Sequence, residues 1–171
     1  MLSDQEIASL VALPKLLPAR RSRQLLEETR YRSKNEITPH QVEASLAVPA
    51  DNGLFTILVR RNKLRAIDFA VILFYSERGR VNDYRLRQYH GGHGGHTNPI
   101  EGTPIPPRTP HIHLATYRYW ERDHDQPDRF AVATDTFEVW EEALYRLLSE
   151  CGFHGSVQGV QIPWPELRGE P

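Results

Sequence analysis

One stretch of the sequence leaves few options for the fold. Residues 66–75, AIDFAVILFY, are almost entirely apolar on both alternating faces, which is typical of a strand at the centre of a sheet. Candidate neighbours lie directly before and after it, over residues 54–61 (LFTILVRR) and 82–90, and only short turn-like segments separate the three. The sequence therefore predicts an antiparallel meander of three strands.

Two helices are predicted before the meander. Ser3 and Glu6 form a capping box, and the apolar residues that follow at helical spacing extend a short helix to about Leu13. Residues 19–31 give a second helix, which is largely polar. Residues 33–53 contain prolines and a turn signal, so we expect an irregular connection there.

Further strands are predicted after the meander. Residues 111–120 (HIHLATYRYW) give a fourth strand, and residues 130–133 give a short fifth one across a polar loop. A possible strand over residues 157–162 lies in a loop-like tail.

The most regular helix follows the fifth strand. Asp135 and Glu138 form a second capping box, and apolar residues then recur every three or four positions up to Cys151, where Gly152 ends the helix. We expect an α+β fold: an antiparallel meander of four to five strands, with this C-terminal helix on one face and two N-terminal helices. We expect one domain over residues 1–171, comprising a helical segment (1–36), a core (54–150) and a tail (155–171).

Composition and charge restrict the class of protein to which this chain can belong. The chain has 171 residues and a formal net charge of −1, which suits a soluble domain and excludes a globally basic nucleic-acid binder. Locally, residues 60–118 carry ten Lys or Arg against four acids, whereas residues 120–171 carry eleven acids against four arginines. A basic face for a phosphate-bearing partner is one interpretation, and opposite charges on facing elements are the other. No stretch of about 18 apolar residues or signal peptide occurs, and the single cysteine indicates a reducing cytoplasm.

Histidines are concentrated in one segment. Five of the eight lie between positions 90 and 113, namely His90, His93, His96, His111 and His113. His111 and His113 are two apart on a predicted strand, so both side chains should point away from Ile112 and the core. Such a pair can chelate a divalent metal, can serve as acid and base on a phosphodiester, or can be part of a polar strand surface.

The loop before this strand allows several interpretations. The glycines of His90-Gly-Gly-His93-Gly-Gly-His96 permit close backbone approach to a ligand, or mark a flexible insertion. No cofactor is required, although His96, His111 and His113 could together hold a divalent metal with an open position for water. The motifs of P-loop NTPases, dinucleotide-binding enzymes and serine hydrolases are missing, which argues against those classes.

RNA cleavage would use these residues as follows. His111 and His113 would act as base and acid, with His96 nearby, and cations would stabilise the developing charge. Arg85 and Arg87, which we expect on one strand face opposite Leu86, could supply those cations. The predicted substrate-binding residues are Arg85, Arg87, Asn98, Tyr117 and Arg118, the tyrosine by stacking on an unpaired base.

The string His96-Thr97-Asn98-Pro99, followed by Gly102 and Pro110-His111-Ile112-His113, resembles the signature of a small bacterial and prophage-borne family of unknown function. It is also loosely similar to the TumE-type toxin components of type II toxin–antitoxin pairs, which have a different histidine spacing. The resemblance covers about residues 54–150, and its distinctive part is residues 96–113. It implies a mobile-element or toxin-like setting with nuclease activity, and it supplies no catalytic residues.

The sequence thus favours a cytoplasmic, toxin-like ribonuclease that uses His96, His111 and His113 on RNA or another nucleic acid. Such a protein would have a cognate antitoxin or a complex subunit as partner, and no membrane contact. One alternative is a non-enzymatic subunit of a bacterial defence or antidefence complex. Another is a metal-binding hydrolase with histidine ligands.

Overall fold

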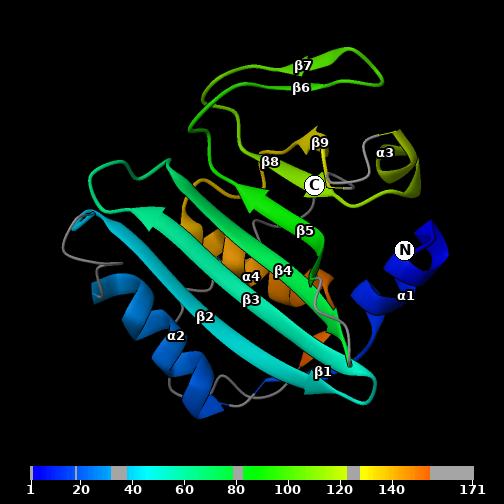
Figure 1. The fold of residues 1–171 in the computed structure, drawn as a ribbon. Helices are drawn as coiled ribbons and strands as arrows, with labels where there is room; N and C mark the ends of the chain where they lie inside the picture. The colour runs from blue at the N-terminus through cyan, green and yellow to red at the C-terminus, as the bar shows by residue number, and fades with distance from the viewer. Residues whose placement is uncertain (1, 18, 32–37, 79–82, 123–127, 155–171) are drawn as a thin grey trace, which may run out of the picture.

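A six-stranded antiparallel sheet forms the centre of the protein (Figure 1). The computed structural model describes residues 2–17, 19–31, 38–78, 83–122 and 128–154. The strands, in their order across the sheet, are β2 (Gln41–Ala50), β3 (Gly53–Asn62), β4 (Phe69–Glu77), β5 (Asp83–His90), β8 (His111–Leu114) and β9 (Phe130–Ala133). The predicted meander is therefore confirmed as β3–β4–β5, and with it the α+β class.

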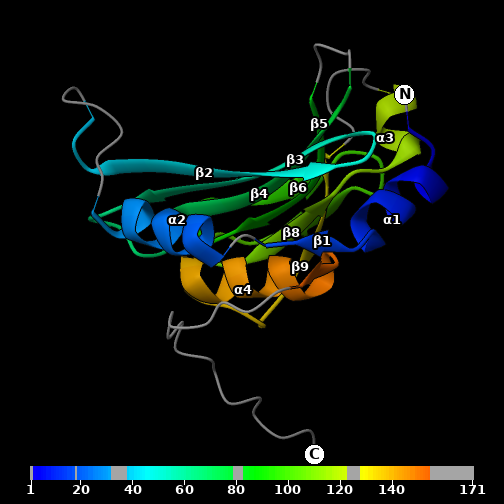
Figure 2. The same ribbon diagram turned by 90° about the horizontal axis from the view of Figure 1, so that it is seen from below.

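Helices and small strand pairs surround this sheet. The helices are α1 (Asp4–Ala12), α2 (Ala19–Tyr31), α3 (Tyr117–Arg122) and α4 (Trp140–Glu150). Figure 2 shows that α2 and α4 cover the same face of the sheet. The remaining strands form two separate pairs, β1 (Lys15–Leu16) with β10 (Phe153–His154), and the hairpin β6 (His96–Asn98) with β7 (Thr103–Ile105). None of the helices in the described ranges combines the length and apolar character needed to cross a lipid bilayer.

The core lies between the sheet and α4. Alternate residues of the long strands point into the core. In β2, for example, buried residues alternate with residues that are exposed or half-buried. The apolar stripe of α4 supplies the other side of the core. The residues involved include Ala44, Leu46, Phe55, Ile57, Val71, Leu73, Tyr89, Phe137, Leu144 and Leu147.

Residues 41–50 correct the prediction of an irregular connection over 33–53, because they form the edge strand β2. Their sequence, QVEASLAVPA, alternates apolar and polar or small side chains, as a strand with one buried face does. Pro49 suggested a loop, but an edge strand tolerates proline because one side of its backbone has no partner strand.

The predicted fourth strand over residues 111–120 is too long. β8 ends at Leu114, and α3 begins at Tyr117, whose backbone N–H donates a 2.7 Å hydrogen bond to the Asp4 carboxylate. An acidic side chain at the start of a helix satisfies one of its free N–H groups, so α1 supplies the cap that starts α3.

The capping box predicted at Asp135 and Glu138 is also wrong. Helix α4 begins at Trp140, and the Glu142 carboxylate accepts hydrogen bonds from the backbone N–H groups of Glu138 and Val139. Gly152 has a φ of +70° at the end of α4, as predicted from its position after Cys151. The predicted strand over 157–162 and the tail 155–171 lie outside the described residues.

Lys15 connects the ends of two helices. Its side chain is 2% exposed, and its ammonium group lies 4.3 Å from the centre of the Phe55 ring. The group donates hydrogen bonds of 2.7–3.0 Å to four carbonyl oxygens, those of Leu10, Val11, Leu13 and Cys151. Burial lowers the pKa of Lys15 to about 8, so the group is charged at neutral pH. It therefore satisfies carbonyl groups at the C-terminal ends of α1 and α4 that neither helix can satisfy itself.

Replacing Lys15 with Met should lower the free energy of unfolding by about 3–5 kcal/mol, because it leaves several buried carbonyl oxygens without a donor. Urea unfolding followed by circular dichroism measures this. The exposed Lys63 is the matched control, and Lys63→Met should cost less than about 1 kcal/mol. Equal effects of the two substitutions would contradict the role given to Lys15.

Candidate metal centre

The histidines gather on the sheet face opposite α2 and α4. In β8, Ile112 packs against the core, whereas His111 and His113 point the other way, which confirms the predicted common face. β5 pairs with β8 so that His90 lies opposite His111. Directly paired residues on one face of an antiparallel sheet have neighbouring side chains, so three imidazoles meet here.

These three rings are close enough to share one ion. A ring nitrogen of each of His90, His111 and His113 lies within 4.8 Å of those of the other two. The ring centres are 4.7 Å apart for His90 and His113, 5.0 Å for His111 and His113, and 5.4 Å for His90 and His111. His111 and His113 are 4% and 9% exposed. We call His90, His111 and His113 the histidine triad.

His96 lies beside the triad rather than in it. Its ring centre is 4.7 Å from that of His113 and 5.8 Å from that of His111. The trio predicted from the sequence, His96, His111 and His113, is thus close together, but the three nearest ring nitrogens include His90 in place of His96.

Hydrogen bonds to backbone carbonyls fix two rings of the triad. The Nδ1–H groups of His111 and His113 donate 3.0 Å bonds to the carbonyl oxygens of Thr109 and Asp128. A carbonyl oxygen can only accept, so Nδ1 carries the proton in each ring and Nε2 carries the lone pair. Metal-binding histidines almost always have such a partner on the second nitrogen.

A chain of side chains fixes the third ring. Nε2–H of His90 donates to the amide oxygen of Gln88 at 3.2 Å, and the Gln88 amide nitrogen donates to the Asp128 carboxylate. Arg85 pairs with the same carboxylate at 3.6 Å. Asp128 therefore supports two members of the triad, His113 through its backbone and His90 through Gln88.

Asn98 fixes His96 and the hairpin. Its amide exchanges two 2.8 Å hydrogen bonds with the backbone of Ala131 in β9, and its nitrogen also donates to Thr103. The amide oxygen accepts a 3.1 Å bond from Nε2 of His96, which leaves Nδ1 of that ring with the lone pair. Asn98, predicted to bind substrate, here attaches β6 to the edge of the sheet.

The triad is neutral at physiological pH. Burial, and then the repulsion that protonated neighbours in the histidine cluster would exert, lowers the pKa of His90 to about 2 and that of His113 to about 3. Burial lowers the pKa of His111 as well. Neutral imidazole is the form that binds metals, because protonation removes the lone pair.

The glycines after His90 allow close backbone packing within the protein. A Cβ atom on Gly91 would lie 2.2 Å from the carbonyl oxygen of Ile67, and one on Gly92 would lie 2.5 Å from the backbone of Arg108. The glycines thus permit a close backbone approach, as predicted, but the neighbour is another part of the protein's own backbone. The loop so held places the exposed ring of His93 5.4 Å from that of His90.

The predicted cations do not form one cluster. Leu73 and Phe74 of β4 pair with Arg87 and Arg85, so Leu86 is an extra residue that forms a β-bulge. Because a bulge breaks the alternation of side chains, Arg85 reaches Asp128 beside the triad, whereas Arg87 pairs with Glu150 of α4 at 3.6 Å. The expectation that the two arginines share a face is therefore wrong.

The two remaining predicted residues belong to α3. Arg118 pairs with Glu101 and lies 5.1 Å from the centre of the Phe130 ring. Tyr117 is 41% exposed at the start of the helix rather than on a strand beside the histidines. Neither residue contacts a triad ring among the interactions of the described residues.

Sequence reasoning missed the parts of the site that depend on pairing. His90 enters the triad because β5 lies next to β8, and Gln88 and Asp128 support it from β5 and from the segment before β9. Gln88 and His90 are two residues apart, so the sequence places them on one strand face. Knowledge that β5 pairs with β8 would have identified both as neighbours of the histidine pair. Asp128 lies in a polar stretch with no periodicity that could single it out.

No family model matches the chain, and neither does any curated protein or solved structure with which it was compared. The functional argument therefore starts from the geometry of the histidines.

The metal-free protein should lose stability in mild acid. The pKa of His113 is about 3 in the folded protein against 6.5 for the ordinary side chain, so the unfolded chain binds more protons between these values. These histidines therefore cost no stability above pH 6.5. As the pH drops below 6.5, the free energy of unfolding decreases by up to about 1.4 kcal/mol per pH unit for each such histidine. Urea unfolding of EDTA-treated protein at pH 7.5 and 5.0 measures the slope. His113→Gln, which cannot titrate at that position, should make the slope smaller, and an unchanged slope would contradict the assignment.

Proposed function

We propose that this protein is a metalloprotein in which His90, His111 and His113 hold one divalent transition-metal ion such as zinc. One observation carries the proposal: each of three neutral rings brings a nitrogen within 4.8 Å of the other two, and each ring also donates one N–H to the protein. Three protein ligands of this type are the usual set of a catalytic zinc site.

A three-ligand site can support hydrolysis. A zinc ion held by the triad would leave a position for water, and it would supply a water whose pKa is low enough to make it a nucleophile near neutral pH. His96 is next to the triad, with its ring orientation set by Asn98. From there it could serve as a fourth ligand or contact the water.

The same geometry weighs against a metal-free acid–base pair. General acid catalysis needs a protonated imidazole in useful amount at the working pH. Burial keeps the pKa of His113 at about 3, so very little of the acid form exists near pH 7. A metal uses the neutral form, which is the form that this site favours.

Hydrolysis of RNA is the activity to test first, because the sequence predicts it. We retain the toxin-like, cytoplasmic setting and a protein partner as parts of this proposal. Arg85, whose side chain is 54% exposed and pairs with Asp128, is the predicted substrate-binding cation that is nearest to the triad through its contacts.

Metal uptake tests the ligand assignment. The wild-type protein, dialysed against zinc or cobalt and then freed of excess ion, should retain one equivalent per chain, measured by plasma mass spectrometry. His113→Ala should lower the affinity at least tenfold. His40→Ala is the matched control, since His40 is exposed outside the site, and it should bind as the wild type does. Gln88→Leu should weaken binding about 10- to 100-fold, because it removes the partner of His90.

Absence of retained metal from the folded wild type would overturn the proposal. Retention by His113→Ala at wild-type affinity would overturn the ligand assignment.

Cleavage of a fluorescent mixed-sequence RNA tests the activity. The zinc-loaded protein should cleave it, EDTA should stop the reaction, and zinc should restore it. Cleavage that persists in EDTA but is lost in His111→Ala would instead indicate a metal-free histidine ribonuclease. No cleavage by the metal-loaded protein would leave the metal site intact and remove RNA as the substrate.

A further inference from the structure

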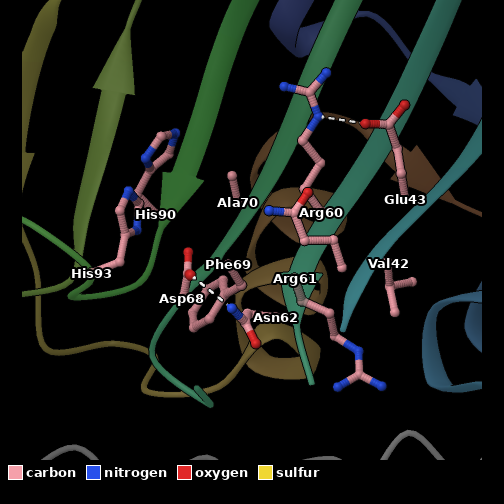
Figure 3. Close-up of a pocket in the computed structure, with 11 residues that line it drawn as sticks. Val42, Glu43, Arg60, Arg61, Asn62, Asp68, Phe69, Ala70, His90 and His93 are labelled. Carbon is pink, nitrogen blue, oxygen red and sulfur yellow. Dashed lines mark hydrogen bonds and ion pairs between the residues drawn. The ribbon is translucent and has the colours of Figure 1, made fainter. Parts of the chain in front are cut away.

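A pocket opens on the sheet beside the triad. Its volume is about 230 Å³, and His90, which belongs to the triad, is part of its wall. Figure 3 shows His90 and His93 on one side, Arg60 and Glu43 on the other, and Ala70 between them. The pocket therefore adjoins the proposed metal.

The register of the sheet explains why a hollow exists here. Glu43 pairs with Arg60, Arg60 with Ala70, Ala70 with His90, and His90 with His111, so these residues form one row across five strands. Side chains at directly paired positions lie on the same face. Strands are about 4.8 Å apart, so the backbones at Arg60 and His90 are separated by about 10 Å with only a methyl group between them.

Arg60 lines this hollow and has donors available for a ligand. Its Nε–H donates a 2.9 Å hydrogen bond to the Glu43 carboxylate, and its side chain is 54% exposed. Within the part of the chain that the structure describes, the two terminal NH₂ groups of Arg60 have no other hydrogen bond. Glu43 thus fixes the guanidinium through one nitrogen and leaves its other donors available to an oxyanion.

The end of the pocket opposite Arg60 limits the charge and the size of the ligand. Asp68 lies there and accepts a 3.3 Å hydrogen bond from the Asn62 amide, as Figure 3 shows. A second negative group on the ligand would meet this carboxylate, and like charges brought together at a binding site are costly. The volume is also below the 300–1,000 Å³ that is typical of pockets for larger ligands.

We propose that the pocket over Ala70 binds a single phosphate group, held between the Arg60 guanidinium and the metal of the histidine triad. This inference rests on the proposed function, because the metal supplies the second positive charge. The phosphate comes either from a small free phosphate compound or from the end of an RNA strand, since both present the same group.

Phosphate titration of the cobalt-loaded protein tests this. Cobalt absorbs visible light according to its ligands, so a phosphate entering its coordination shell changes the spectrum. Inorganic phosphate should bind the wild type saturably, and pyrophosphate should bind more weakly. Arg60→Gln should weaken phosphate binding at least tenfold, Arg60→Lys less so, and Ala70→Leu should block it by filling the hollow.

Cobalt retention is measured on every variant, and Arg20→Gln, an exposed arginine of α2, is the matched control that should bind phosphate as the wild type does. A 5′-phosphorylated oligoribonucleotide that competes with inorganic phosphate, while its unphosphorylated form does not, would identify the RNA end as the source. Failure of both oligonucleotides to compete would identify a small compound.

Two outcomes overturn the inference separately from the proposed function. If Arg60→Gln and Ala70→Leu retain cobalt and bind phosphate like the wild type, the metal site stands and the phosphate pocket is refuted. The same holds if pyrophosphate binds the wild type more tightly than phosphate. If the wild type retains no cobalt, the proposed function fails and the phosphate pocket fails with it.

Discussion

The hydrogen bonds from His111 and His113 to two backbone carbonyl oxygens determine what this face of the sheet can do. They assign the ring protons to Nδ1 and leave a lone pair on each Nε2, in a buried site where protonation is unfavourable. Three neutral imidazoles whose ring nitrogens lie within 4.8 Å of one another match the ligand set that a divalent transition-metal ion takes from proteins. This match is the physical reason for proposing a metal at the triad.

One face of the sheet forms the hydrophobic core, and the other carries the candidate site. On the helix side, β4 and α4 form the core, and Lys15 satisfies the ends of α1 and α4. That stability lets the other face keep closely packed imidazoles and a hollow above a single small residue. Asp128 and Asn98 hold the histidine side in place. Asp128 accepts hydrogen bonds from His113 and Gln88, and Asn98 bonds both to His96 and to Ala131 of β9.

Much of the fold could be predicted because its patterns are local. The apolar strand β4 and the stripe of α4 are visible in any short window, and so is the alternation of His111 and His113 on one face. The rest depends on contacts between distant segments. Twenty residues separate His90 from its partner His111, and the bulge at Leu86 that divides Arg85 from Arg87 has no signal in the sequence. These contacts turned a histidine pair into a triad and removed one arginine from the site.

The central claim concerns the position of one ion, so the most direct measurement is anomalous X-ray diffraction from crystals soaked in zinc at its absorption edge. The account predicts a single strong peak about 2.0–2.1 Å from one ring nitrogen of each of His90, His111 and His113. A soaked crystal with no peak at the triad, or with its strongest peak at other residues, would contradict it.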